Sequence, residues 1–332
     1  MNFASSAGYW GTNLNAMPHN CGMANKRLML LDTASLYFRA FYGVPTSVVA
    51  PDGTPVNAVR GLMDFISRLV TDHRPTDLIA AWDDDWRPEF RVAAIPSYKA
   101  HRVAEEADPE LDGETVPDEL LPQVRLIEDL LRYAGIARLG MPGYEADDVI
   151  GSLASQTNVP VFVVTGDRDL FQLVDDDQPI RVLYTAAKGV GNAEIIDDAA
   201  VIERYGVHAR EYAEFALLRG DPSDGLPGVR GIGEKTAASL IRDYGDIGSL
   251  VAAAEDDSST LKPGVRKNLL AGREYIAVAG PVVQVAREID LPPVDSTLPT
   301  HPADADALIA LAATWGLQSP LDRLSEAMGW QL

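Results

Sequence analysis

The sequence of 332 residues contains a single cysteine, Cys21. One thiol excludes an internal disulfide and a cysteine-based metal site, and it fits a protein that works in a reducing compartment. The sequence also lacks any apolar run of about 18 residues and the apolar core of a signal peptide, so it predicts neither a membrane span nor export. We therefore expect a cytoplasmic protein without a membrane partner.

Positive charge is scarce as well, since 28 Lys and Arg residues face 49 Asp and Glu residues and the net charge is −21. This balance argues against nonspecific attraction to nucleic acid or to an anionic membrane, so a polyanionic partner must bind at a local basic patch. Apolar residues make up 46% of the chain, enough for one large α/β domain or a domain with a smaller appendage.

Several apolar runs of strand length end directly at acidic residues. The acids at these ends are Asp32, Asp83, Asp167 and Asp169. Uninterrupted apolar runs are typical of strands buried on both faces of a mostly parallel sheet with helices on either side. Further strands are expected at residues 135–139 and 180–184. In such α/β folds the ligand crevice lies beyond the carboxyl ends of the strands, so these acids are predicted to share one edge.

Residues 143–151 (GYEADDVIG) place Glu145, Asp147 and Asp148 at the start of an apolar helical segment. Acids are favoured at a helix N-terminus, so a well-capped surface helix is the ordinary interpretation of this stretch alone. We predict Glu145 as the cap, which turns Asp147 toward the other acids. Clustered carboxylates repel one another without a compensating cation, and their convergence predicts Mg²⁺ or Mn²⁺.

The second half of the chain is predicted to be helical, with helices at residues 199–205, 209–219, 234–244, 247–254 and 265–278 and one or two closing helices over 303–328. A glycine-rich turn over residues 220–237 contains Asp221 and Asp224 and leads to Lys235. Glycines allow close backbone approach, and amides that open a helix bind anions. The turn therefore predicts a phosphate-binding element beside two further acids.

We expect three parts: an extension over 1–26, an α/β core over 27–198 that includes a loop at 84–123, and a helical part over 199–332 whose last helices pack back on the core. The loop contains Arg91, Tyr98, Lys99 and Arg102. Such cations neutralise phosphates and tyrosine stacks on unpaired bases, although for these residues on their own an exposed loop with ordinary charges is the better explanation.

Six short blocks of the sequence, in their order along the chain, resemble the bacterial 5′ nuclease family, meaning the 5′→3′ exonuclease domain of DNA polymerase I and its free-standing flap endonuclease relatives. The resemblance covers the chain from about Leu28 to its end. The blocks that carry it are Leu31-Asp32, Trp82-Asp83, Phe90-Arg91 with Tyr98 to Arg102, Glu145 to Gly151, Thr165 to Asp169, and Gly220-Asp221 through Ala237.

The resemblance implies roles for these residues. The acids gather around two or more divalent ions, namely Asp32, Asp83, Glu145, Asp147, Asp148, Asp167, Asp169, Asp221 and Asp224. The Tyr98 to Arg102 block, with Arg91, belongs to a helical arch that handles the frayed 5′ strand. A helix-turn-helix grips duplex phosphates, often with a K⁺ ion, through the block that holds Gly228, Gly231, Gly233, Lys235 and Thr236.

The sequence also departs from the family pattern. Thr33 and Gly225 stand where Gly and Asn are common, Asp84 and Asp85 compete with Asp83 as the ligand at that strand end, and an acidic insertion over 103–115 lengthens the arch. The acidic charge of that insertion puts phosphate affinity there in question.

The function implied is two-metal hydrolysis of a DNA phosphodiester at a 5′ flap or recessed 5′ end, in primer removal and repair, by a monomer acting on branched or RNA-primed DNA. Two alternatives remain open at this point: a junction-binding protein without a working metal site, and a metal-dependent ribonuclease with a similar acidic core. The sequence does not decide whether a polymerase or a clamp recruits the protein.

Overall fold

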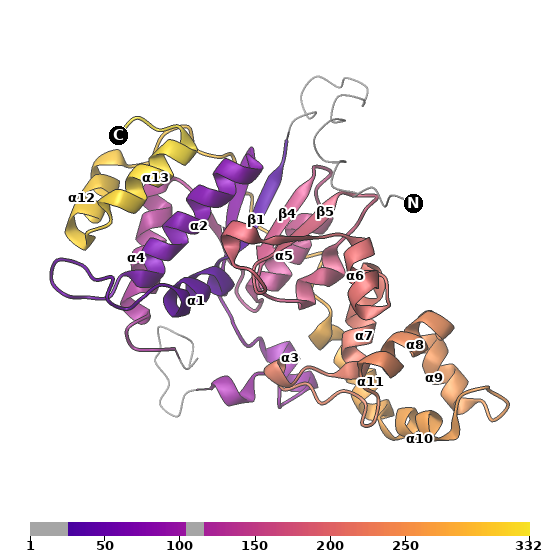
Figure 1. Ribbon diagram of the computed structural model, residues 1–332. Coiled ribbons are helices and arrows are strands. Elements are labelled where there is room, and N and C mark those ends of the chain that lie inside the picture. The colour runs from indigo at the N-terminus through magenta and orange to yellow at the C-terminus, as the bar shows by residue number, and fades with distance from the viewer. Residues whose placement is uncertain (1–25, 104–115) are drawn as a thin grey trace, which may run out of the picture.

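The computed structural model describes residues 26–103 and 116–332 (Figure 1). Residues 1–25 of the expected extension, and most of the acidic insertion, lie outside this part of the chain.

A six-stranded sheet in the order β3-β2-β1-β4-β5-β6 forms the centre. All neighbouring pairs are parallel except β5 and β6, which pair in the antiparallel sense. The strands are β1 (Leu28–Asp32), β2 (Asp77–Ala81), β3 (Ala137–Leu139), β4 (Val161–Thr165), β5 (Ile180–Tyr184) and β6 (Glu194–Ile196). The predicted mostly parallel sheet is confirmed, whereas the three-residue β6 carries no sequence pattern and was not predicted.

Helices cover both faces of the sheet and form most of the second half of the chain (Figure 1). They are α1 (Thr33–Gly43), α2 (Asn57–His73), α3 (Glu89–Ala94), α4 (Leu121–Ala134), α5 (Ala146–Ser155), α6 (Asp198–Tyr205), α7 (Tyr212–Arg219), α8 (Glu234–Tyr244), α9 (Ile247–Glu255), α10 (Pro263–Ala271), α11 (Arg273–Val283), α12 (Ala305–Trp315) and α13 (Gln318–Met328).

The single helix predicted over 265–278 is wrong, because the chain forms two helices, α10 and α11, that meet at Gly272. A Cβ at Gly272 would lie 3.1 Å from Cγ1 of Val229, so the bend brings the backbone close to the turn before α8. Apolar periodicity continues across such a bend, and the sequence pattern alone does not reveal it.

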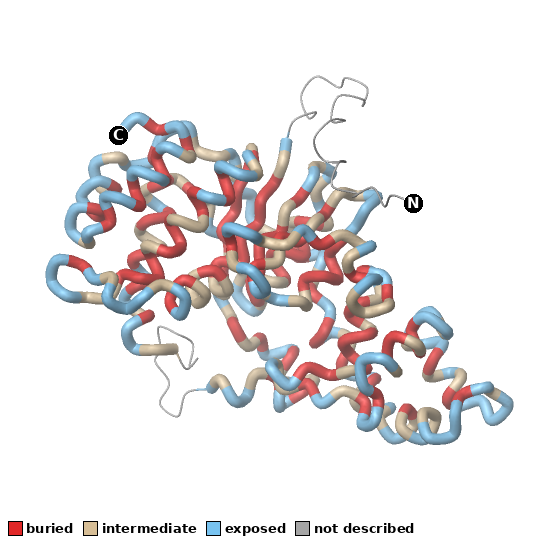
Figure 2. The backbone as a smooth tube through the Cα atoms, in the orientation of Figure 1, coloured by how far each residue is buried: buried red, intermediate tan, exposed pale blue. Residues whose placement is uncertain are grey.

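The central strands are mostly buried (Figure 2). Alternate residues of these strands enter two separate hydrophobic cores. Leu28 and Leu30 of β1 face α5 and the helical half, whereas Met29 and Leu31 face α2 and α4. This alternation follows from the two-residue period of a strand. Because helices cover both faces of the sheet, a site is expected beyond the carboxyl ends of the strands.

The end of the chain returns to the core, where α13 lies along α2 and α12 contacts α4 (Figure 1). On the way, the N–H of Leu78 donates to the carbonyl of Ser296 at 2.7 Å. The indole N–H of Trp330 donates to the carbonyl of Pro299 at 2.8 Å, and Arg323 pairs with Asp64 at 2.6 Å. These contacts seal the face of the sheet opposite α5.

Candidate metal centre and nucleic-acid-binding groups

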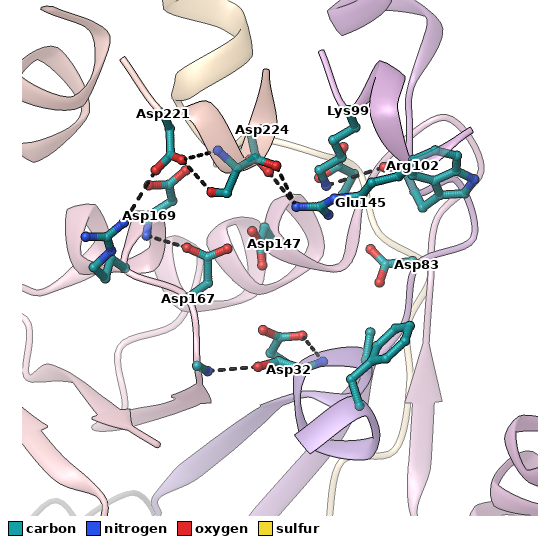
Figure 3. Close-up of a pocket in the computed structure, with 17 residues that line it drawn as sticks. Asp32, Asp83, Lys99, Arg102, Glu145, Asp147, Asp167, Asp169, Asp221 and Asp224 are labelled. Atoms are coloured by element: carbon teal, nitrogen blue, oxygen red, sulfur yellow. Dashed lines mark hydrogen bonds and ion pairs between the residues drawn. The ribbon is translucent and has the colours of Figure 1, made fainter. Parts of the chain in front are cut away.

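A cavity of about 340 Å³ lies at the carboxyl edge of the sheet (Figure 3). Eight carboxylates line it: Asp32, Asp83, Glu145, Asp147, Asp167, Asp169, Asp221 and Asp224. They come from the ends of β1, β2 and β4, from the start of α5, and from the turn after α7. Among the described residues, only three cationic side chains line the same cavity, those of Lys99, Arg102 and Arg168.

Asp32 is held at the junction of β1 and α1. Its Oδ1 accepts from the N–H of Ser35 at 3.1 Å and caps α1, and its Oδ2 accepts from the hydroxyl of Thr165 at 2.6 Å. The N–H of Gly166 in turn donates to the hydroxyl of Ser35 at 2.9 Å. The ends of β1 and β4 are thereby tied together, which fixes the separation between Asp32 and the acids that follow β4.

Asp83 and Glu145 are fixed by the start of α5. Oδ1 of Asp83 accepts from the N–H of Ala146 at 2.8 Å. Glu145 is the N-cap of α5, as predicted, and it forms a reciprocal capping box with Asp148. Its carboxylate accepts from the hydroxyl of Tyr98 at 2.8 Å and from Nζ of Lys99 at 2.7 Å.

Asp221 and Asp224, at a short helical turn over Pro222–Asp224, lie across the cavity from Asp32 (Figure 3). Asp221 caps this turn and accepts from the N–H of Ser223 at 2.9 Å. Asp224 pairs with Arg102 at 2.9 Å. The helical half therefore contributes two carboxylates to a site that is otherwise built from the sheet.

The protonation of these acids reflects their crowding. Burial raises the pKa of Asp32 to about 7, with a hydrogen bond from Thr165 opposing the rise and the charge of Asp83 adding to it. Burial, and then the charges of Asp32 and Asp167, raise the pKa of Asp147 well above its usual value. Burial also raises the pKa of three others: Asp83, Asp169 and Asp224. Carboxylates crowded in this way require a cation to be fully ionised at neutral pH.

The side chains at the cavity fit divalent cations that prefer oxygen ligands, because eight carboxylates offer their oxygens there. Within residues 26–103 and 116–332, no three His, Cys, Asp or Glu side chains enclose a ready-made position for an ion. The carboxylates instead stand on opposite walls of the cavity (Figure 3). Such an open arrangement suits ions that keep several waters or take substrate oxygens as ligands.

Asp148, Arg91 and Tyr98 are placed differently from what the sequence led us to expect. Asp148 is fully buried outside the cavity, and its two oxygens accept from the Arg91 guanidinium at 2.9 and 2.7 Å. Arg91 and Tyr98 are each 3% exposed, and both contact Glu145. The two terminal NH groups of Arg91 and the hydroxyl of Tyr98 donate to these buried carboxylates, so in this structure Asp148 stabilises the site from behind, and Arg91 and Tyr98 face protein instead of solvent.

Lys99 and Arg102 line the cavity, and their predicted contact with a phosphate stays a prediction. Although burial disfavours its charge, the Glu145 carboxylate raises the pKa of Lys99 well above its usual value, so the ammonium stays charged. At the end of β2, Asp84 pairs with Arg138 at 2.9 Å, whereas Asp83 lines the cavity.

The sequence did not single out several residues that line the cavity, among them Ser35, Phe38, Trp86, Arg168 and Ser223. Phe38 lies on α1, and its ring stacks on that of Tyr42 with centroids 6.5 Å apart and planes 13° apart. The signal that could have found Phe38 is its spacing of three residues after Ser35, which puts both side chains on the face of α1 that meets the site.

The glycine-rich turn lies between α7 and α8. Its first part, with Asp221, Ser223 and Asp224, lines the acidic cavity, whereas residues 225–236 lie outside the lining. Gly228 and Gly231 have positive φ angles, and a Cβ on either would come within 2.6 Å of a neighbouring residue. Gly233 caps α8 and has open space where a Cβ would be. Lys235 is exposed and Thr236 half-buried in the first turn of α8. The turn presents the open N-terminus of a helix, a suitable site for phosphate.

Comparison with known proteins gives the family of the chain. Residues 27–206 match the N-terminal resolvase-like domain of 5′-3′ exonucleases, and residues 207–306 match their C-terminal SAM fold. The chain belongs to the 5′-3′ exonuclease family. The resemblance stated from the sequence is confirmed, and the chain is a nuclease that hydrolyses phosphodiesters.

Several relatives share most of the chain. A 5′-3′ exonuclease of Streptomyces coelicolor is 60% identical over 296 residues, covering 89% of this chain and 98% of that protein. A 5′-3′ exonuclease of Mycobacterium tuberculosis is 51% identical, with 91% and 97% covered. DNA polymerase I of Mycobacterium bovis is 38% identical over 309 residues, which are 92% of this chain and 32% of the polymerase.

Solved structures share the fold at low sequence identity. The D15 protein of T5, crystallised with metal ions, has a TM-score of 0.61 and 17% identity, with 91% of this chain and 98% of that chain covered. The catalytic core of Rad2 in complex with a DNA substrate has a TM-score of 0.55 and 18% identity, with 91% and 92% covered. In the part of the chain that the structure describes, no helix is both long and apolar enough to cross a bilayer.

Proposed function

We propose that the protein is a structure-specific 5′ nuclease that cleaves DNA at 5′ flaps and recessed 5′ ends, with two or more Mg²⁺ or Mn²⁺ ions at the acidic cavity. The convergence of eight carboxylates at one sheet edge carries this proposal. Bound there, divalent ions supply Lewis acidity to a phosphate and lower the pKa of a water. The residues that would hold them are the eight that line the cavity.

The other parts of the site orient the substrate. Lys99 and Arg102 place positive charge beside the acids, where a phosphate backbone must enter. Each of these cations is tied to a carboxylate, Lys99 to Glu145 and Arg102 to Asp224, so its position is fixed relative to the site that holds the ions. Fixed donors need no reorganisation when the scissile phosphate arrives.

We further propose that the helical part from about residue 199 grips the duplex. The Gly228 to Thr236 turn supports this assignment, because its glycines expose the backbone. The N–H groups that open α8 can donate to a phosphate, and carbonyl oxygens of the turn can bind K⁺. The duplex and its unpaired 5′ strand would then meet at the cavity between this part and the residues of the arch. The same proposal includes a role in primer removal and repair, with RNA-primed and branched DNA as substrates. It also includes action as a monomer in the cytoplasm.

The test is cleavage of end-labelled 5′-flap, nicked and blunt duplexes with Mg²⁺, with Mn²⁺ and with a chelator. We expect cleavage near the junction of the flap substrate with either ion and none with the chelator. Binding to the flap without turnover in either metal would instead identify a junction-binding protein, and a preference for single-stranded RNA would identify a ribonuclease.

A further inference from the structure

The base of the arch, residues 97–102, lies directly against the turn that carries Asp221 and Asp224. The hydroxyl of Ser97 donates to the carbonyl of Gly225 at 2.8 Å, and the N–H of Lys99 donates to the carbonyl of Asp224 at 3.0 Å. Arg102 donates to the carbonyl of Ser223 at 3.0 Å as well as to the Asp224 carboxylate. Segments more than 120 residues apart in sequence are thus joined beside the cavity.

Gly225 is what allows this contact to be so close. Its φ is +71°, and a Cβ added there would lie 2.1 Å from the backbone carbonyl oxygen of Ser97 and 3.5 Å from the N of Lys99. The nearest atoms belong to backbone, so no change of rotamer could make room for a side chain. The family pattern commonly has Asn at this position, and Asn accepts a left-handed φ but would still carry the Cβ.

The contact also determines how Lys99 is held. Lys99 is one of two residues other than glycine with positive φ among the described residues, at +47°. Its N–H donates to the backbone carbonyl of Asp224 and its Nζ to the Glu145 carboxylate, so both ends of the residue are bonded to residues that line the cavity. A left-handed backbone persists in such a residue only where the surroundings enforce it. The contact beside this backbone is the hydrogen bond from the N–H of Lys99 to the docked turn.

We infer that the close contact between Gly225 and Ser97 sets the position of the arch base on the acidic turn, and thereby the distance between the phosphate-binding cations and Asp224. Ser97 and Gly225 are positioning residues, since neither lines the cavity. The inference rests on the proposed function for its catalytic consequence, whereas the docking itself is a property of the protein alone.

The experiment compares Gly225→Asn with Gly329→Asn. Gly329 caps α13 with φ 72° and ψ 22°, nearly the same backbone as Gly225 with φ 71° and ψ 20°, and it has open space where a Cβ would be. Hydrogen exchange of the peptide over residues 97–103 is measured without metal or DNA. In Gly225→Asn we expect exchange at least about fivefold faster, because the N–H of Lys99 loses its acceptor. Gly329→Asn should match the wild type.

Kinetics on a 5′-flap duplex give the second measurement. A shift of the arch base misplaces Lys99 and Arg102, so kcat of Gly225→Asn should fall about 10- to 100-fold while KM changes less than about twofold. Ser97→Ala removes one docking hydrogen bond without adding atoms. It should give a smaller increase in the exchange rate and a smaller fall in kcat. This second variant keeps the test valid if Gly225→Asn does not fold.

The outcomes are distinct. Unchanged exchange in both Gly225→Asn and Ser97→Ala overturns the docking, and faster exchange with unchanged kcat overturns the positioning role. An equal effect in Gly329→Asn overturns it too, because the cause would not be local. If the wild type cuts no flap substrate, the proposed function fails, while the exchange data still report whether Gly225 holds the arch base.

Discussion

Arg91 and Asp148 form a buried ion pair behind the acidic cavity, joined by two hydrogen bonds of 2.9 and 2.7 Å. The pair links α3, at the root of the arch, to α5, and Asp148 also accepts from the N–H of Ala286 at 2.8 Å. Three segments of the chain therefore meet on one carboxylate. A buried charge paired in this way is costly to expose alone, so the pair locks the elements that carry it.

We predict that Asp148→Asn destabilises the protein, whereas Asp147→Asn does not. Removing the charge of Asp148 leaves Arg91 buried with only Glu145 nearby, and loss of one partner of a buried pair costs about 3–5 kcal/mol. Asp147 faces the cavity among other acids, so its neutral variant relieves repulsion. Thermal unfolding in chelator should show a lower Tm for Asp148→Asn and an equal or higher Tm for Asp147→Asn.

The same two variants separate structure from metal binding. Calorimetric titration with Mn²⁺ should show weakened binding and at least about 100-fold lower kcat for Asp147→Asn, since even the outer partners of metal ligands contribute about 10- to 100-fold. Asp148→Asn should keep the wild-type number of ions at a temperature where it is folded. The reverse pattern would make Asp148 a metal ligand and contradict its placement behind the cavity.

The sequence predicted most of the acid set because strand ends obey a local rule. Buried parallel strands are recognisable as apolar runs, and their carboxyl ends bring Asp32, Asp83 and Asp167 to one edge whatever the loops do. Asp148 does not follow from such a rule. Spacing along a helix places it near Glu145, but only the position of Arg91, 57 residues earlier, decides that it turns away from the cavity.

Short elements and long-range contacts were beyond the sequence for the same reason. The six residues of α3 and the three of β6 are too few to show a period. The docking of Ser97 on Gly225 joins segments 128 residues apart. The glycine at position 225 departs from the family pattern, but the sequence does not say which residue packs against it. Tertiary packing determines these features, and local periodicity of the sequence does not reveal it.

The stability of the metal-free protein should fall as pH rises from about 4 to 7. The folded pKa of Asp32 is about 7 against 3.8 for the ordinary group, so between these values the unfolded chain loses its proton first and ionisation opposes folding. Tm measured in chelator from pH 5 to 7 should therefore decline. Saturating Mn²⁺ should remove the decline, because the ions favour ionised carboxylates. A Tm that rises over this range in chelator would contradict the crowding of the acids.

Phe38 is predicted to contact a base of the substrate. It lines the cavity and stacks on Tyr42, which is 73% exposed, so the two rings form a path from the acids to solvent. Stacking on an aromatic ring contributes about 1–3 kcal/mol per base, so Phe38→Leu should raise KM for a flap duplex roughly 5- to 150-fold. Phe38→Tyr keeps the ring and serves as the control. An unchanged KM in the leucine variant would show that Phe38 only packs.

Gly151 is predicted to be required for the packing that holds Asp148. It lies inside α5, and a Cβ there would stand 2.5 Å from the carbonyl oxygen of Ala286, the residue whose N–H donates to Asp148. Gly151→Ala must push this backbone away, and overpacking of this kind costs about 1–3 kcal/mol. Gly264→Ala, in α10 with open space around it, is the matched control and should be neutral or stabilising by up to about 1 kcal/mol. Urea unfolding of both variants measures the difference. Equal stability of the two would mean that the connector after α11 shifts without cost, and Asp148 would then depend on Arg91 alone.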